Sequence, residues 1–375
     1  MRTRSPAQAA LIALAALAAC ERAESREPAL SPLEEYNRQL AARWATARPV
    51  LREPEAAFSR AFRLLRRATL ELPGDPGIAL LPTVCGMDGE GTVYLGTRRT
   101  SLVHRWSLAD GRIERIPFRA ADAPRDPTAL AWSADENTLY LLDSGGKRLL
   151  RYAPDGTLRG YTYLNGGQTG FSLALLPGGS VLAGGERWED DGAVTLLAVY
   201  DRGGRLRRAF LPMDSAVIAS NAHAHVPVVF AVEEGGTLLA AEPTSYRIRR
   251  LSPEGAELAR FGEPPPGYAA PSPRNERATL PETEAWLAGW TPLLFVHAGD
   301  GLAFAAYEVR RPYRGFQLDV YTRDGRRLAE GLLSDAQPTC GSGRTLVFTR
   351  RTGPGTVELL AYAYEGTERH QEVER

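Results

Sequence analysis

The chain has 375 residues and carries 45 basic and 45 acidic side chains, so its formal net charge is zero. A chain with this balance lacks the basic surplus that holds nucleic acids, which excludes nucleic-acid binding as its main activity. Its 37 glycines and 27 prolines indicate many turns between short elements. The length allows one large all-β domain or two smaller domains.

The first twenty residues indicate export. Arg2 and Arg4 precede an apolar run, 7–19, that is too short to span a membrane. The run ends in Leu17-Ala18-Ala19-Cys20, which resembles the lipobox of bacterial lipoproteins. The resemblance implies cleavage before Cys20 and acylation of this cysteine, so that lipid holds the mature chain on a membrane. Glu21 fits transport to the outer membrane, facing the periplasm or the cell surface, and an ordinary secretory signal is the alternative.

Two helices are predicted between the signal and the rest of the chain. Ser31-Pro32-Leu33-Glu34 follows a polar tether and has the features of a helix start, with a capping serine, a proline in the first turn and a glutamate closing a capping box. A second helix is predicted to begin at Pro54, with Phe58, Phe62 and Leu65 on its apolar face. We expect it to pack against its own domain, and binding flat on the membrane surface is the alternative.

From Ala68 onward, short apolar runs alternate with turn motifs. The clearest stretch, 127–161, contains four strand-like runs separated by Ala-Asp-Glu-Asn, Ser-Gly-Gly-Lys and Pro-Asp-Gly. Such turns between apolar runs are strong hairpin signals, so this stretch predicts a four-stranded meander. Matching turns recur along the chain and predict six units, with their turn glycines at Gly111, Gly156, Gly204, Gly255, Gly325 and Gly366.

Six meanders of roughly 40–50 residues are typical of a β-propeller, whose blades bury their faces against one another. The units, best seen in 134–161 and 229–261, resemble six-bladed propellers of the NHL-repeat and TolB-like kind. The resemblance implies an all-β propeller over residues 68–375, preceded by the signal peptide, 1–19, and a tether with amphipathic helices, 20–67. The sixth unit lacks a fourth strand, so Ala68–Leu72 is predicted to supply the outer strand of the last blade and close the ring.

Two cysteines remain once Cys20 is assigned to lipid. Cys85 and Cys340 lie in the related strings Pro-Thr-Val-Cys-Gly and Pro-Thr-Cys-Gly, in the first and last units. Equivalent positions in those units become neighbours in a closed ring, and an oxidising compartment favours a disulfide there. Two separate buried thiols are the alternative.

Loops are the expected place for a binding site. In propellers the loops joining the second and third strands of each blade, and the links between blades, share one face, which we call the loop face and which by family resemblance is usually the binding face. This sequence has a long insertion, 262–292, an acidic loop, 186–191, and a basic loop, 310–314. The polar and aromatic residues predicted to form a ligand site are Trp188, Tyr246, Trp286, Trp290, Arg311 and Tyr313, and plain solvated loops are the alternative.

Two alternating histidines raise the alternative of a metal site. His223 and His225 would face one side of an extended segment, where such a pair binds zinc or another divalent ion when further ligands are present. Glu242 and His297 are guesses for a third ligand. Some six-bladed propellers are metal-dependent lactonases or lyases that use acidic and Asn ligands, for which Asp88, Asn221 and Asp300 are the available residues.

The sequence contains no G-x-S-x-G, H-E-x-x-H, P-loop or dinucleotide motif. We therefore expect a binding protein rather than an enzyme, with no cofactor. The prediction is an envelope lipoprotein whose propeller binds a protein, peptide, glycan or small ligand on its loop face. The alternative is a metal-dependent hydrolase or lyase, using zinc or calcium at the mouth of the central channel.

Overall fold

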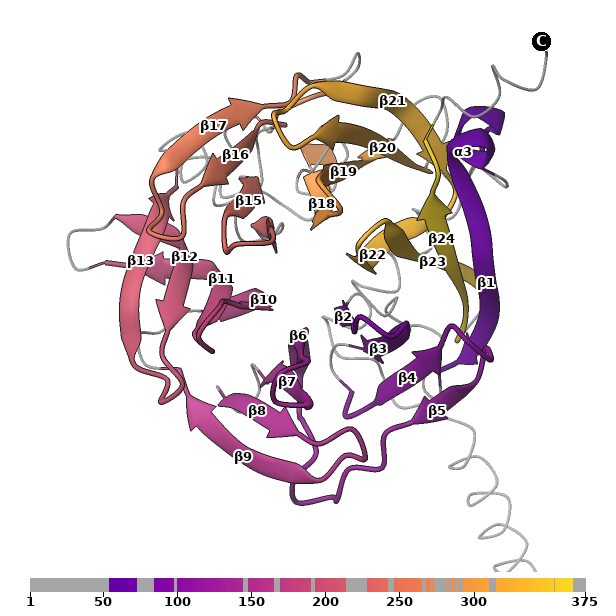
Figure 1. The fold of residues 1–375 in the computed structure, drawn as a ribbon. Coiled ribbons are helices and arrows are strands. Elements are labelled where there is room, and N and C mark those ends of the chain that lie inside the picture. Colours follow the sequence, from indigo (N-terminus) through magenta and orange to yellow (C-terminus); the bar gives the residue numbers. More distant parts are fainter. Residues whose placement is uncertain are drawn as a thin grey trace, which may run out of the picture. The chain divides into compact units, whose positions relative to one another are not determined.

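The computed structural model describes residues 54–72, 84–97, 100–143, 148–164, 169–189, 193–213, 228–241, 246–264, 268–270, 272, 282, 285–286, 289, 293–309, 315–353 and 355–366. Within these residues, six four-stranded antiparallel sheets are arranged in a ring (Figure 1). The chain is therefore a six-bladed β-propeller, and the predicted all-β, six-bladed fold is confirmed.

The blades follow one another along the chain, and each begins with its innermost strand (Figure 1). Blade 1 consists of β2 (Val84–Met87), β3 (Thr92–Gly96), β4 (Val103–Ser107) and β5 (Ile113–Arg115), and blade 2 of β6 (Pro127–Ser133), β7 (Thr138–Asp143), β8 (Arg148–Tyr152) and β9 (Leu158–Tyr163). Blade 3 consists of β10 (Thr169–Leu175), β11 (Val181–Trp188), β12 (Val194–Tyr200) and β13 (Leu206–Pro212), and blade 4 of β14 (Val229–Val232), β15 (Leu238–Ala241), β16 (Ile248–Leu251) and β17 (Glu257–Phe261). Blade 5 consists of β18 (Leu293–Gly299), β19 (Leu302–Val309), β20 (Gly315–Thr322) and β21 (Arg327–Ser334), and blade 6 of β22 (Gln337–Ser342), β23 (Thr345–Gly353), β24 (Thr356–Tyr364) and β1 (Phe62–Glu71).

The predicted turn glycines serve the contact between blades as well as the turn itself. Gly204, between β12 and β13, has a φ of 77°, and a Cβ there would lie 2.3 Å from the backbone oxygen of Tyr163 in the preceding blade. Gly325, between β20 and β21, has a φ of 85°, and a Cβ there would lie 2.7 Å from the Cβ of Phe261. Glycine therefore permits both the left-handed backbone and the close approach of one blade to the next.

Buried side chains hold neighbouring blades together. The described residues form six hydrophobic clusters, and each draws its members from two adjacent blades. The cluster between blades 1 and 2, for example, contains Val84 and Val103 from blade 1 with Leu141 and Leu150 from blade 2. One meander thus buries its faces only because copies stand on both sides of it.

The first strand closes the ring. β1 pairs antiparallel with β24, from Phe62 opposite Tyr364 to Glu71 opposite Thr356. The predicted closure of the last blade by an N-terminal strand is confirmed, although the strand begins at Phe62 rather than Ala68. Residues 62–67 therefore belong to the propeller and not to the helical segment.

The predicted second helix is shorter than its apolar periodicity indicated. α3 covers only Ala56–Ala61, and the prediction that it continues through Leu65 is wrong because pairing with β24 takes the backbone of the following residues. Phe58 is fully buried and stacks on Phe62 at 4.6 Å, with Tyr362 edge-on at 5.3 Å. The helix packs against its own domain, as predicted. In the described part of the chain, no helix is long and apolar enough to cross a membrane.

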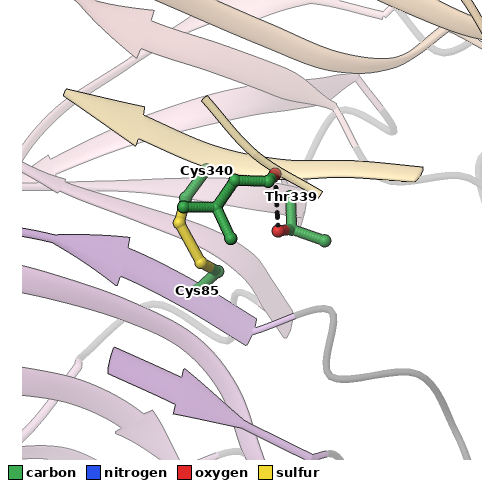
Figure 2. Close-up of a disulfide and its surroundings, with 4 residues drawn as sticks. Cys85, Thr339 and Cys340 are labelled. Atoms are coloured by element: carbon green, nitrogen blue, oxygen red, sulfur yellow. Dashed lines mark hydrogen bonds between the residues drawn. A yellow bond between two sulfur atoms is a disulfide. The ribbon is translucent and has the colours of Figure 1, made fainter. Parts of the chain in front are cut away.

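A disulfide lies at the inner side of the same closure. Cys85 in β2 and Cys340 in β22 are joined by a disulfide bond (Figure 2), and they are 255 positions apart in sequence with their Cα atoms 5.5 Å apart. The neighbouring Thr339 donates a hydrogen bond to the carbonyl oxygen of Val347, at 3.0 Å. β1 thus completes blade 6 at the rim, and the disulfide links blades 6 and 1 near the centre.

Candidate functional site

A cavity of about 690 Å³ lies on the loop face between blades 1 and 2. Its described lining comes from the loop between β3 and β4, the link between β5 and β6, and the first residue of β8. Arg115, Arg125 and Arg148 line it together with Thr100, Ser101 and Phe118, and four alanine and proline residues complete the described lining. Small-molecule sites occupy about 300–1,000 Å³, so this space, the blade 1–2 cavity, has the size of a ligand site.

A buried carboxylate organises one wall of this cavity. Asp143, the last residue of β7, is completely buried. Its Oδ1 accepts hydrogen bonds from the backbone N–H groups of Arg125, at 3.0 Å, and Asp126, at 2.8 Å. Its Oδ2 accepts a hydrogen bond from Nη2 of Arg148, at 2.9 Å. Because a buried carboxylate needs such partners, Asp143 fixes the interblade link and Arg148 in place together.

Arg148 connects the cavity to an aromatic surface. Its side chain is 18% exposed, and its guanidinium carbon lies 5.6 Å from the centre of the Tyr161 ring. The Nε–H group of Arg148 is buried and has no hydrogen-bond partner among the described residues. Tyr161 and Tyr163 on β9 lie edge to face at 5.5 Å and are 49% and 54% exposed. Arg148, which lines the cavity, therefore carries a buried donor with no described acceptor and lies against an accessible ring.

The described lining is positively charged. It contains three arginines and no carboxylate. Asp122 and Asp126 belong to the same link but are not among the lining residues. Burial and the Arg115 guanidinium lower the pKa of His104, which lies opposite Arg115 on β4. His104 is therefore held in its neutral form, and the positive charge at the cavity is that of the arginines.

Tyr152, at the end of β8, holds the link between blades 1 and 2 in place. The Tyr152 hydroxyl donates a hydrogen bond to the carbonyl oxygen of Asp122, at 2.5 Å, and its ring lies 4.5 Å from that of Phe118. Burial raises the pKa of Tyr152, so the hydroxyl keeps its proton and remains a donor at neutral pH. The link that carries Arg125 is thus held at two points. Tyr152 holds it at Asp122, and Asp143 holds it at Arg125 and Asp126.

A second cavity, of about 830 Å³, lies between blades 4 and 5. Its described lining includes Arg260, Tyr321, Arg327 and Glu330, and we call it the blade 4–5 cavity. Arg327 pairs with Glu330 at 2.7 Å, and Arg260 pairs with Glu257 at 2.8 Å. Two of its three described lining arginines, Arg260 and Arg327, are thus paired with carboxylates, whereas in the blade 1–2 cavity only Arg148 has such a pair among the described residues.

The structure describes three of the six residues that the sequence placed in one ligand site, Trp188, Tyr246 and Trp286. Trp188 ends β11 of blade 3 and is 55% exposed on the loop face. The prediction that Tyr246 lies on the accessible rim is wrong, because its side chain is only 1% exposed. Its hydroxyl donates a hydrogen bond to Asp319, and Tyr268 and Tyr307 pack against its ring. Tyr246 is a core residue of the junction between blades 4 and 5.

Other predicted residues lie in or near the long insertion, or outside the described residues. Trp286 belongs to the insertion, and its indole N–H donates a hydrogen bond to the carbonyl oxygen of Ser272, at 2.7 Å. The predicted site, lipid-attachment and metal-binding residues that lie outside the described residues are Cys20, Asn221, His223, His225, Glu242, Trp290, Arg311 and Tyr313.

The described acidic and histidine residues suggested as metal ligands serve turns instead. Oδ1 of Asp88 accepts hydrogen bonds from the backbone N–H groups of Glu90 and Thr92 in the β2–β3 turn, at 2.9 and 2.7 Å. His297 lies 3.0 Å from the carbonyl oxygen of Gly343 through Nε2, and burial lowers its pKa to about 4. Within the described ranges, no group of three His, Cys, Asp or Glu side chains is arranged to hold a metal ion.

The blade 1–2 cavity was not predicted from the sequence. Its arginines come from three segments, at positions 115, 125 and 148, and only the ring brings them together. One available signal was the link between β5 and β6, Ile116–Asp126, which is longer than a tight turn and contains two arginines.

Comparison with known proteins supports the fold. No protein-family model and no curated protein matches the chain. A solved member of the DUF4221 family from Bacteroides vulgatus is 8% identical, with a TM-score of 0.56 over 84% of this chain and 99% of that chain. A putative exported protein from Bacteroides fragilis is 10% identical, with a TM-score of 0.53 over 85% and 98%. A gluconolactonase from Xanthomonas campestris is 15% identical, with a TM-score of 0.50 over 84% and 97%.

At these identities the likeness concerns the fold alone. The class of protein is a six-bladed β-propeller.

Proposed function

We propose that this chain is an exported lipoprotein whose propeller binds a small ligand in the blade 1–2 cavity. The observation that carries the proposal is the cavity itself, about 690 Å³ on the loop face, with hydroxyl, guanidinium and aromatic side chains in its lining. The sequence alone also allows a protein, a peptide or a glycan as the bound partner. A pocket of this volume favours a small ligand, because protein partners bind through broad surfaces.

Filling the cavity tests this proposal. Ala121 is exposed and lines the cavity, so Ala121→Trp is expected to block it without disturbing the core. Ala134 is exposed in the β6–β7 turn of the same region of sequence but on the opposite face of blade 2, so Ala134→Trp is the matched control. The measurement is the shift in melting temperature with a panel of small acids, phosphates, sugars and neutral aromatic compounds.

At least one compound is expected to raise the melting temperature of the wild type and of Ala134→Trp, and to leave Ala121→Trp unchanged. The proposal fails if no compound behaves in this way, or if Ala121→Trp responds as strongly as the wild type.

The lipid anchor is the second part of the proposal. It is supported by the apolar run and by Leu17-Ala18-Ala19-Cys20. Cells that express the full chain are labelled with an alkyne fatty acid and then fractionated. The wild type is expected in the membrane fraction with label, and Cys20→Ser without label. An unlabelled wild type, or equal labelling of both, contradicts the anchor.

The alternative function, that of a metal-dependent hydrolase or lyase, predicts a different result. It requires stoichiometric zinc or calcium that is lost in His223→Ala and His225→Ala. Under the binding proposal there is no resident cofactor, so elemental analysis of the purified protein is expected to find no stoichiometric metal.

A further inference from the structure

We infer that the ligand of the blade 1–2 cavity carries an anionic group, a carboxylate or a phosphate, joined to a flat ring. The anionic group binds between Arg125 and Arg148, and the ring packs on Tyr161. This inference rests on the proposed function, because it names the chemistry of the ligand at the same site.

The charge of the cavity supports the anionic group. Three of its described lining residues are arginines and none is acidic. Among the described residues, Arg148 has one carboxylate partner, Asp143, while no ion pair involves Arg115 or Arg125. A guanidinium binds carboxylate and phosphate groups through parallel charge-assisted hydrogen bonds. Within the described part of the chain, two of the three lining arginines therefore carry positive charge with no carboxylate paired to them.

Arg148 is ordered before any ligand arrives. Asp143 holds its Nη2 at 2.9 Å, and most of the side chain is buried. Ligand binding consequently does not have to immobilise a flexible arginine, which removes an entropy cost that weakens many charged contacts. The buried Nε–H remains without an acceptor in the described structure, and an unsatisfied donor is costly. An acceptor on the ligand that reaches this Nε–H group would remove that cost.

Tyr161 supports the flat ring. Its side chain is 49% exposed and lies against the Arg148 guanidinium at 5.6 Å. Tyr163 meets it edge to face, which limits the orientations that the Tyr161 ring can take. An accessible ring in a fixed orientation next to a cation offers a stacking surface to an aromatic ring whose acidic group reaches the arginines.

The blade 4–5 cavity provides an internal comparison. It is the larger of the two, and it also contains arginines. Arg327 and Arg260 are paired with Glu330 and Glu257, so an anion that binds either of these two arginines must compete with a carboxylate. Free anions are therefore expected at the blade 1–2 cavity and not at the blade 4–5 cavity.

Calorimetric titration of the purified full chain, at fixed ionic strength, tests the inference with three probes. Inorganic phosphate carries the anionic group alone, phenyl phosphate adds a ring, and phenol carries the ring alone. Phenyl phosphate is expected to bind most tightly, inorganic phosphate more weakly and phenol not measurably. Arg125→Gln is expected to weaken both phosphates about tenfold, since a charge-assisted hydrogen bond contributes on the order of one tenfold step in affinity.

Three further variants separate the contributions of the ring, the net charge and the guanidinium. Tyr161→Ala is expected to weaken phenyl phosphate about fivefold and to leave inorganic phosphate unchanged. Arg112 is 74% exposed at the β4–β5 turn, away from the loop face, so Arg112→Gln removes the same charge and is expected to change nothing. Arg125→Lys keeps the positive charge but loses the planar guanidinium that can donate two parallel hydrogen bonds to phosphate. Its affinity for phosphate is expected to lie between those of the wild type and Arg125→Gln. Melting curves serve as the control that each variant is folded.

The outcomes distinguish this inference from the proposed function. If neutral compounds still stabilise the wild type but not Ala121→Trp, and phosphates bind no better than phenol, the inference is overturned while the proposed function stands. Equal losses in Arg112→Gln and Arg125→Gln also overturn it, because they indicate attraction by net charge alone. If no compound distinguishes Ala121→Trp from the wild type, both fail.

Discussion

The junctions between blades 1 and 2 and between blades 4 and 5 each bury an aspartate completely, but they supply its hydrogen bonds differently. Asp143 pairs with the Arg148 guanidinium and two backbone N–H groups. Asp319 accepts hydrogen bonds from the hydroxyls of Tyr246 and Tyr321 and from the N–H of Gly331, the last at 2.9 Å. In both junctions a partner of the aspartate also lines a cavity, Arg148 in one and Tyr321 in the other.

The difference decides what each cavity offers to a ligand. At the blade 1–2 cavity, the cation that satisfies the buried carboxylate stands beside two further arginines without carboxylate partners in the described structure. At the blade 4–5 cavity, hydroxyls satisfy the carboxylate, and the nearby arginines pair with glutamates. The residue that holds the buried aspartate and lines the cavity is therefore a cation in the first junction, Arg148, and a neutral hydroxyl in the second, Tyr321.

Removing Asp143 is expected to have the largest effect. Asp143→Ala leaves Arg148 without its carboxylate and frees the link at Arg125, so it should lower the free energy of unfolding by about 3–5 kcal/mol. Urea denaturation measures the change. Asp135→Ala, in the exposed β6–β7 turn, is the control and should stay within about 0.5 kcal/mol of the wild type. A loss below about 1 kcal/mol in Asp143→Ala would mean that the buried pair does not hold this junction.

Tyr246→Phe is expected to have a smaller effect at the other junction. It removes one hydroxyl donor from Asp319 but leaves Tyr321 and Gly331 in place, so we expect a loss of about 1–3 kcal/mol. The same urea experiment measures it, with Tyr163→Phe as the control because Tyr163 is 54% exposed. Equal stability of the two variants would show that the Tyr246 hydroxyl contributes nothing to the junction.

The junction between blades 4 and 5, in which tyrosine hydroxyls donate to Asp319, should also lose stability at alkaline pH. Burial and the Asp319 carboxylate raise the pKa of Tyr321 from 10.0 to about 12. Because the folded pKa lies above the unfolded one, this stabilisation is complete below pH 10 and is lost as the pH rises towards 12. The loss should reach about 1–2 kcal/mol, measured by urea denaturation between pH 9 and 11.5.

Tyr321→Phe is the control for this pH dependence. Burial also raises the pKa of Tyr94 and Tyr140 to about 12, and both tyrosines remain in the variant. The fall in stability with pH should therefore be shallower in Tyr321→Phe than in the wild type. Parallel slopes would assign the alkaline sensitivity to other groups.

The smallest expected effect on the free energy of unfolding distinguishes Arg125, which we propose binds the ligand, from Arg327, which pairs with a glutamate. Arg125→Gln removes no ion pair of the described structure, so its free energy of unfolding should stay within about 0.3 kcal/mol of the wild type. Arg327→Gln removes the pair with Glu330, at 2.7 Å, and should cost about 0.5 kcal/mol. Precise thermal melts of both variants check this order. A larger loss in Arg125→Gln would give that side chain a structural role.

Most of the fold was predictable because its signals are local. In blade 2 the predicted runs correspond to β6, β7, β8 and β9, with differences of one or two residues at their ends. An Asp-Gly or Gly-Gly pair determines a hairpin within four residues, and repetition of the hairpin determines the propeller. The length of the second helix was not predictable in this way. Residues 62–71 follow their pairing with β24, which is distant in sequence.

The candidate site was much less predictable, because it depends on which segments the ring brings together. Tyr246 follows a strand and precedes another, as a loop aromatic does, but Asp319 from blade 5 and Tyr268 from the insertion bury it. Arg125 and Arg148 carry no motif, and their role follows only from their common contact with Asp143. Local sequence indicates neither contact.

The pairing of β1 with β24 has a consequence for the order of folding. Glu71 and Thr356, which meet in this pair, are 285 positions apart. During synthesis β1 emerges first, and its edge has no partner until Thr356–Tyr364 has been made. Unpaired strand edges are prone to aggregation, and contacts over such sequence distances form slowly. Blade 6 is therefore the last to assemble, and a nascent chain interrupted before Tyr364 leaves the ring open.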